Sequence, residues 1–403
     1  MKTLEMNNNK NIIKNIVSHL DGQKLYLIAW TVFLTGNTLT TTMFQVPGML
    51  LTLCNLLPVL LILAKILLYD HFTAVEFWGL GVVLLIGILI AVKSGYKEPL
   101  LWLIMLVGAK DVPFQKILQV YVIIVVSIVI MAFCASILEV IENLQYKVVE
   151  TGKIRNSFGA MYTTDFASHI FSSVLSIFYL LKNRIKMWHY ITVIVISALV
   201  FAFCNTRLDV GCIIILLVAF LCLNIWEKKY SVVKKYQPYT RTCKKIKWFM
   251  PAMMLLMFAT TILYSPKNPI LSTLDDILST RLKLGKQGLS EYGMTLFGQQ
   301  VDMVGNGGST IRLKEYFFVD CSYIYIFLRY GLIFLLITLA VYMLCCKKYE
   351  NDPYFLVAIV LVSINCMIAH HIVELTYCPF ALAVFSAKDQ VYGKKYRFSG
   401  RRE

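Results

Sequence analysis

The chain has 403 residues, of which 58% are hydrophobic and 15% charged, and its mean hydropathy is +0.68. A typical soluble domain is about 45–50% apolar and about 25% charged. This composition excludes a soluble enzyme, a disordered chain and a nucleic-acid-binding domain in water. It indicates an all-α, polytopic integral membrane protein.

Apolar runs of membrane length predict about twelve transmembrane helices, because a helix needs about 20 apolar residues to cross a bilayer. The first twenty residues lack the long apolar core of a signal peptide, so residues 1–24 are expected to be a cytoplasmic segment. We expect a single transmembrane domain at 25–387, followed by a basic cytoplasmic tail at 388–403. The predicted helices lie at 25–40, 48–68, 76–92, 98–109, 117–138, 164–181, 188–205, 209–226, 248–264, 320–345, 354–370 and 376–387.

The distribution of the basic residues predicts the orientation. The net charge is +16. If the N-terminus lies inside, the inner segments hold 25 Lys and Arg and the outer segments hold 12. Cytoplasmic loops of membrane proteins carry such an excess. Both termini are therefore expected in the cytoplasm, and the excess charge needs no nucleic-acid partner.

Two outer segments, 139–163 and 265–318, are too long to be simple connections. The second is the large outer loop between the ninth and tenth predicted helices. It contains a predicted surface helix with Ser272 or Thr273 as its cap and Asp275 in its first turn. Chemistry is therefore expected at the outer face.

Four arginines lie in the outer segments: Arg155, Arg207, Arg281 and Arg312. A guanidinium group presents a planar fork of donors that suits phosphate oxygens. Arg207 lies between two apolar runs with almost no loop, where a charge is costly without a partner. Its expected partner is a lipid pyrophosphate; the alternatives are a salt bridge to Asp209 or extension of the side chain to the lipid headgroups.

Arg155 is followed within eleven positions by turn residues, Tyr162 and Asp165, a pattern that fits either a ligand-facing loop or a solvated one. Asp320 lies where the large loop returns to the membrane. Partial desolvation would raise its pKa and let it accept a proton from a sugar hydroxyl; capping the next helix is the alternative role. Arg329 lies within the tenth predicted helix and must face protein or water.

His370 and His371 lie at the outer end of the eleventh predicted helix. Adjacent residues of a helix point to different faces, so on that assumption they are a poor metal pair. Neither a metal ion nor a cofactor is predicted.

Three stretches give the chain a resemblance to the Wzy-type polymerases of bacterial surface polysaccharide, within the O-antigen polymerase and ligase group. These stretches are Gly108–Phe114 with Lys116; Arg155–Gly159 through Thr164–Phe166; and Arg281 through Phe297-Gly298 to Val319–Tyr323 with Tyr330-Gly331.

The resemblance implies a metal-independent glycosyltransferase of GT-C-like architecture in the cytoplasmic membrane, with a cavity open to the outside. Its donor and acceptor would be oligosaccharide repeat units on undecaprenyl pyrophosphate. The resemblance assigns pyrophosphate binding to Arg155, Arg207 and Arg281. Relatives have a His-Asn pair where this chain has Asp320-Cys321, which makes Asp320 the expected base, with His370 or Asp165 behind it. The expected substrate-binding residues are Asp165, Tyr162, Tyr323, Arg312, His370 and Arg329.

Two other functions remain open at this point. A flippase for lipid-linked oligosaccharides would also need many helices, although the 265–318 segment argues against an alternating-access carrier. A glycan ligase would use the same chemistry on a different acceptor. A flippase and a chain-length regulator are the expected partners of a polymerase in the same pathway.

Overall fold

Long apolar helices form most of the protein in the computed structural model, which describes residues 21–147, 152–230, 244–310 and 316–388. Within these ranges, eight helical segments are long and apolar enough to cross a membrane. They correspond to α3 (Gly48–Leu68), α4 (Ala74–Ser94), α6 (Phe114–Ile137), α7 (Thr163–Leu181), α8 (Met187–Cys204), α9 (Arg207–Tyr230), α11 (Phe249–Leu263) and α14 (Ser322–Lys348). The predicted all-α membrane class is confirmed to this extent.

Helices also lie at three further predicted positions, α2 (Gly22–Leu39), α5 (Glu98–Gly108) and α15 (Pro353–Asn365), but these are not among the segments that are long and apolar enough to cross a membrane, so their predicted spanning role stays a prediction. The twelfth, predicted at 376–387, is wrong. That segment contains the six-residue 3₁₀ helix η3 (Pro379–Val384), most of which is buried. Six residues of 3₁₀ helix rise about 12 Å, far less than the ~30 Å of a bilayer core. The segment is apolar because it lies in the protein core.

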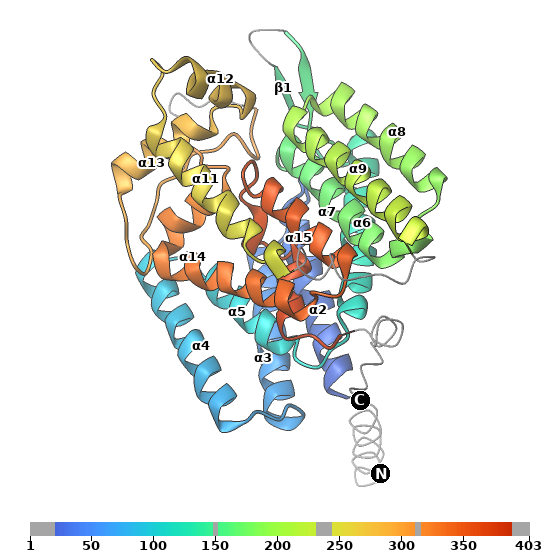
Figure 1. The fold of residues 1–403 in the computed structure, drawn as a ribbon, viewed down its shortest axis with the longest axis vertical. Helices are drawn as coiled ribbons and strands as arrows, with labels where there is room; N and C mark the ends of the chain where they lie inside the picture. Colours follow the sequence, from blue (N-terminus) through green and yellow to red (C-terminus); the bar gives the residue numbers. More distant parts are fainter. Residues whose placement is uncertain (1–20, 148–151, 231–243, 311–315, 389–403) are drawn as a thin grey trace, which may run out of the picture.

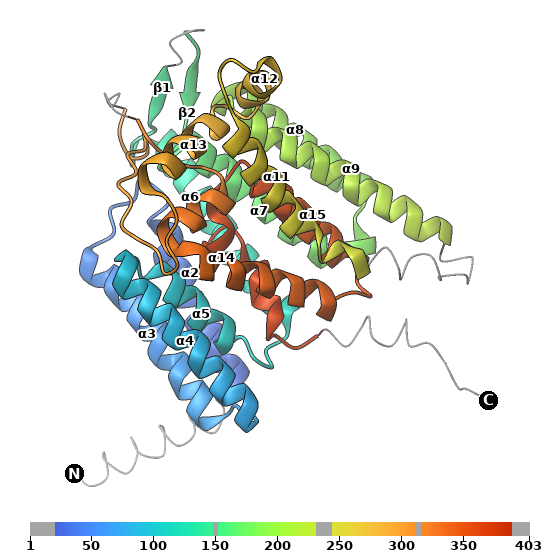
Figure 2. The same cartoon turned by 60° about the vertical axis from the view of Figure 1, so that its left-hand side comes forward.

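The helices form two outlying pairs around a central group (Figure 1). Figure 2 shows α3 and α4 on one side and α8 and α9 on the other, with α14 and α15 between them. The two-stranded hairpin of β1 (Gln145–Lys147) and β2 (Ile154–Asn156) lies at the same end of the molecule as α12 (Pro269–Ile277) and α13 (Arg281–Tyr292).

The outlying helices expose large apolar side chains. Leu60 on α3, Val92 on α4 and Ile191 on α8 are all more than half exposed. Exposed apolar area of this extent is unfavourable in water and is what the lipid-facing side of a membrane helix requires. The centre is packed instead with buried rings, among them Phe114, whose ring centre lies 5.9 Å from that of Phe355. The exposure pattern therefore indicates membrane insertion.

Both ends of the described chain meet at the connection between α5 and α6. The Gln23 side chain donates to the Asp111 carbonyl at 3.3 Å. The Asp111 amide donates to the Phe385 carbonyl at 3.4 Å. The two ends therefore lie on one face of the bundle, and the cytoplasmic identity of that face stays a prediction from the basic residues.

Segment 265–318, predicted to be the large outer loop, forms two helices within its described residues rather than the single one predicted. Asn268, not Ser272 or Thr273, caps α12 through its side chain. The backbone φ angles of +52° at Ser279 and +68° at Thr280 then separate α12 from α13. A helix interior requires negative φ angles, so the chain cannot continue as one helix through this pair.

The close approach of two glycines explains why the sequence has Gly298 and Gly331, which belong to the third stretch named above. α14 is kinked at Gly331 (φ +85°), where the segment around Gly298 (φ +85°) crosses it. A side chain at Gly298 would place its Cβ 2.4 Å from the Arg329 carbonyl oxygen. Both positions need glycine because of the backbone conformation and the close approach.

A buried ion pair at the end of α3 offers a test of this packing. Lys65 Nζ lies 2.6 Å from Asp70 Oδ1 and donates to the Lys110 carbonyl at 2.9 Å. Because Lys65→Met leaves the Asp70 carboxylate buried and unpaired, it should reduce the free energy of unfolding by about 3–5 kcal/mol. The double variant Lys65→Met/Asp70→Asn should recover most of this loss. Thermal unfolding in detergent, followed by the reactivity of buried cysteines, measures both; equal losses in both variants would contradict the ion-pair explanation.

Candidate functional site

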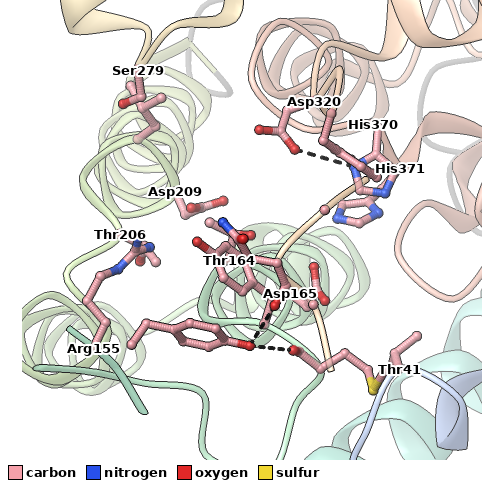
Figure 3. Close-up of a pocket in the computed structure, with 18 of the residues that line it drawn as sticks. Thr41, Arg155, Thr164, Asp165, Thr206, Asp209, Ser279, Asp320, His370 and His371 are labelled. Atoms are coloured by element: carbon pink, nitrogen blue, oxygen red, sulfur yellow. Dashed lines mark hydrogen bonds and ion pairs between the residues drawn. The ribbon is translucent and has the colours of Figure 1, made fainter. Parts of the chain in front are cut away.

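A cavity of about 860 Å³ opens at the end of the bundle that carries the hairpin, α12 and α13. Its lining comes from segments far apart in the sequence, as Figure 3 shows for the residues labelled there. Arg155 and Thr206 lie on one side of this view, and Asp320, His370 and His371 lie on the other.

Arg155 is held rigidly on the first side. It lies on β2, and its Nε donates to the Cys204 carbonyl at 2.9 Å, at the end of α8. Its Nη2 donates to the Thr163 hydroxyl at 2.6 Å, at the start of α7. The guanidinium carbon lies 5.6 Å from the ring centre of Tyr162. Because α7 and α8 both hold this side chain, it needs little rearrangement to receive an anion.

Arg207 is the first residue of α9 and lines the same cavity. The turn before it is tight because Asn205 adopts a left-handed conformation (φ +52°) at the end of α8. Asp209, the alternative partner considered from the sequence, accepts a hydrogen bond from Ser168 at 3.3 Å. Arg207 itself is exposed, so its guanidinium group is accessible to a ligand in the cavity.

Arg281 connects three segments at the other side. Its Nε and Nη2 donate to the Ile368 carbonyl at 3.1 and 3.0 Å. Its Nη2 also lies 3.2 Å from Asp320 Oδ2. The N-cap position of α14 belongs to Cys321, so Asp320 does not take the capping role that the sequence left open. Burial raises the pKa of Asp320, while Arg281 and His371 act in the opposite direction.

We call Asp320, His370, His371 and Glu374 the acid–imidazole wall. α15 ends at Asn365, so the two histidines lie beyond the helix on which the sequence placed them, and His371 begins the short 3₁₀ helix η2 (His371–Val373). His370 Nδ1 lies 3.9 Å from Asp320 Oδ1, and its Nε2 lies 3.4 Å from Glu374 Oε1. His371 Nδ1 lies 2.9 Å from Glu374 Oε2. Acids and imidazoles thus alternate along the wall.

Burial and mutual charge set the pKa values along this wall. Burial and the neighbouring His371 lower the pKa of His370 to about 3. Burial alone would raise the pKa of Glu374, but His371 and His370 lower it to about 2. Burial lowers the pKa of His371, yet Glu374 outweighs it and raises that pKa above its usual value. Near neutral pH the wall therefore holds an ionised Glu374 and a neutral His370.

A stack of three rings supports the wall from behind. The ring centre of His371 lies 3.8 Å from that of Tyr377, which lies 4.0 Å from that of His169 on α7. The Thr41 hydroxyl donates to the Thr38 carbonyl at 2.7 Å, so it accepts the bond from His169 Nε2, also at 2.7 Å. The stack fixes the orientation of the His371 ring.

The cavity brings together most of the residues selected from the sequence. Its lining includes Arg155, Tyr162, Asp165, Arg207, Arg281, Asp320 and His370. These residues come from β2, the starts of α7, α9 and α13, and the segments flanking α14 and η2.

Two selected residues lie away from this lining, and a third, Arg312, lies outside the described residues. Tyr323 is 1% exposed and its hydroxyl donates to the Ser363 carbonyl at 2.8 Å, because its side of α14 faces α15. Arg329 packs its guanidinium carbon 3.6 Å from the ring centre of Tyr96.

Sequence reasoning gave no role to Thr41, Tyr377 and Tyr146, which also line the cavity. The Tyr146 hydroxyl lies 3.2 Å from the Met161 carbonyl oxygen and 3.0 Å from that of Asn306, so the hairpin is joined to the 305–310 turn above the cavity. These residues carry no motif, and their positions depend on tertiary contacts.

No protein-family model, curated protein or solved structure matches the chain. The resemblance to Wzy-type polymerases therefore rests on the short motifs given above.

The placement of Arg281 can be tested through the residue that anchors its helix. Asp275 is 3% exposed and accepts hydrogen bonds from the amides of Leu282 (2.8 Å) and Lys283 (3.1 Å), at the start of α13. Asp275→Ala removes this cap and should lower stability by about 1 kcal/mol, whereas Asp275→Asn keeps an acceptor and should cost less. Hydrogen exchange at the Leu282 and Lys283 amides should accelerate in the alanine variant; unchanged exchange there would refute the anchoring role.

Proposed function

We propose that this chain is a multi-pass membrane glycosyltransferase that joins lipid-pyrophosphate-linked oligosaccharide repeat units into a surface polysaccharide. The observation that carries the proposal is one cavity with Arg155 on the side opposite the acid–imidazole wall and with Arg207 in the same lining. The two sides match the two needs of such a transfer, a stabilised leaving group and a deprotonated acceptor.

The leaving group would be bound by Arg155 and Arg207. Pyrophosphate is already a competent leaving group, so its departure needs charge neutralisation rather than a general acid or a metal ion. Two guanidinium groups supply that charge and a bidentate geometry for phosphate oxygens. Arg155 is oriented before binding by its bonds to Cys204 and Thr163, which avoids reorganisation during the reaction.

The acceptor would be activated at the opposite side. Asp320 is 26% exposed at its side chain, faces the cavity, and has a raised pKa caused by burial. A carboxylate with these properties can accept the proton of a sugar hydroxyl as that hydroxyl attacks the anomeric carbon. His370 and Asp165 line the same cavity and are the next candidates for the base. Direct displacement would invert the anomeric centre.

The cavity volume suits the reacting ends of two glycans rather than whole chains. Sites for small ligands enclose about 300–1,000 Å³, and this cavity of about 860 Å³ falls in that range. The remainder of each glycan would extend away from the membrane, and the polyprenyl tail would stay in the bilayer. The segments predicted to lie inside carry the excess of basic residues. This excess favours the cavity end of the bundle as the outer end.

The test is the glycan profile of cells in which the gene has been deleted. We expect long chains to be lost and single lipid-linked repeat units to accumulate on the outer leaflet, both restored by the wild-type gene. Repeat units retained on the inner leaflet would instead indicate a flippase. Long chains that persist on the lipid carrier without transfer to their final acceptor would indicate a ligase.

The arginines can be tested in the same strain. Arg155→Ala or Arg207→Ala, at unchanged protein level, should lower polymerisation on the order of 10²-fold or more, the usual loss for one transition-state donor. Arg184→Ala is the matched control, because Arg184 is exposed and lies in η1 (Lys182–Arg184), at the far end of α7. Full-length polymer from the Arg155→Ala/Arg207→Ala double variant would exclude the pyrophosphate-binding role.

A further inference from the structure

We infer that His370, His371 and Glu374 form a binding site for one divalent transition-metal ion, with Zn²⁺ as the best match. The ion would bind to three of the four residues of the acid–imidazole wall. Metal binding there goes beyond the proposed glycosyl transfer and does not depend on it. The sequence argument against a metal pair assumed a helix through both histidines, and that helix ends at Asn365.

The donor atoms converge as a metal site requires. One ligand atom from each of the three residues lies within 4.8 Å of the other two. Glu374 Oε1 lies 3.4 Å from His370 Nε2, and Glu374 Oε2 lies 2.9 Å from His371 Nδ1. Ligands bound about 2.0–2.1 Å from a tetrahedral zinc ion lie about 3.3 Å apart. Small side-chain adjustments would therefore bring all three donors to bonding distance.

The chemistry of the donors selects the class of metal. Two imidazoles and one carboxylate suit zinc and related transition metals, whereas Mg²⁺ and Ca²⁺ prefer oxygen ligands throughout. A neutral imidazole nitrogen and an ionised carboxylate oxygen are the donor forms that coordinate a metal ion, so metal binding at this site would release protons. Three protein ligands leave a coordination position open, and all three residues line the cavity.

The surroundings of the wall supply the outer contacts that metal ligands usually have. A metal-bound histidine commonly donates its second N–H to a carboxylate, which fixes the ring. If His370 binds through Nε2, its Nδ1–H faces Asp320 Oδ1 at 3.9 Å. The Tyr377 ring, whose centre lies 3.8 Å from that of His371, restricts the second imidazole.

A metal ion would also fit the charges around His370. Each of its two ring nitrogens faces a carboxylate, Asp320 on one side and Glu374 on the other. A metal-bound imidazole coordinates through one nitrogen and donates through the other, so a cation between Nε2 and Glu374 would leave the Nδ1–H for Asp320.

The experiment measures metal bound to the purified full-length protein in detergent. Metal is first removed by chelation and then returned as Zn²⁺ or Co²⁺. We expect one equivalent of zinc per chain, and Co²⁺ absorption bands typical of low-coordinate nitrogen and oxygen ligation. His371→Ala and Glu374→Gln should weaken binding on the order of 10²-fold or more, and Asp320→Asn by about 10–100-fold.

His71→Ala is the matched control, because His71 is exposed and lies between α3 and α4. It should bind zinc as the wild type does. Thermal unfolding of every variant shows whether it is folded. Absence of saturable binding in the wild type, or wild-type affinity in the folded His371→Ala and Glu374→Gln variants, would overturn the inference. A negative metal-binding result would not change the outcome expected in the polymerisation assay. A negative polymerisation assay would not change the metal-binding result.

Discussion

The contacts of Arg281 hold the candidate site together. One guanidinium group donates to the Ile368 carbonyl and pairs with Asp320 at 3.2 Å. These contacts join α13, the segment before α14 and the segment after α15, which are widely separated in the sequence. A charged group with an 11% exposed side chain needs such partners, because burying it unpaired would be costly. The segment that carries α12 and α13 is thereby attached to the helical bundle at the acid–imidazole wall.

The helical bundle was largely predictable because lipid imposes a simple rule. A membrane helix must be apolar over about 20 residues, and α3, α4, α6 and α8 meet that rule in the sequence. The rule fails at 376–387 because a segment buried in protein is as apolar as one buried in lipid. It fails again at His370, because the apolar run of α15 continues past the end of the helix at Asn365.

The sequence was enough to select several individual residues of the site, but it did not predict how they are arranged in space. Arg155 and Asp165 are close in sequence and share a loop and the helix that follows it, so local pattern was enough to select them. The sequence indicates Asp320 because a polar segment ends there and the apolar run of α14 begins. The role of Glu374 depends on the chain turning back after α15, and that of Tyr377 depends on a stack with His169 of α7. Tertiary contacts of this kind leave no periodic signal in one sequence.

The hydrogen bonds that stabilise the non-helical backbone after α15 also position the acid–imidazole wall. Irregular backbone within an apolar bundle must find partners for its free amides and carbonyls. The Ser322 amide donates to the Cys366 carbonyl at 2.9 Å, and the Ser322 hydroxyl donates to the Ala369 carbonyl at 2.5 Å. Arg281 satisfies Ile368 in the same stretch. The groups that compensate for the lost helix therefore also set the position of the next residue, His370. A continuous helix would need none of these partners, and it would point the two histidines to different faces.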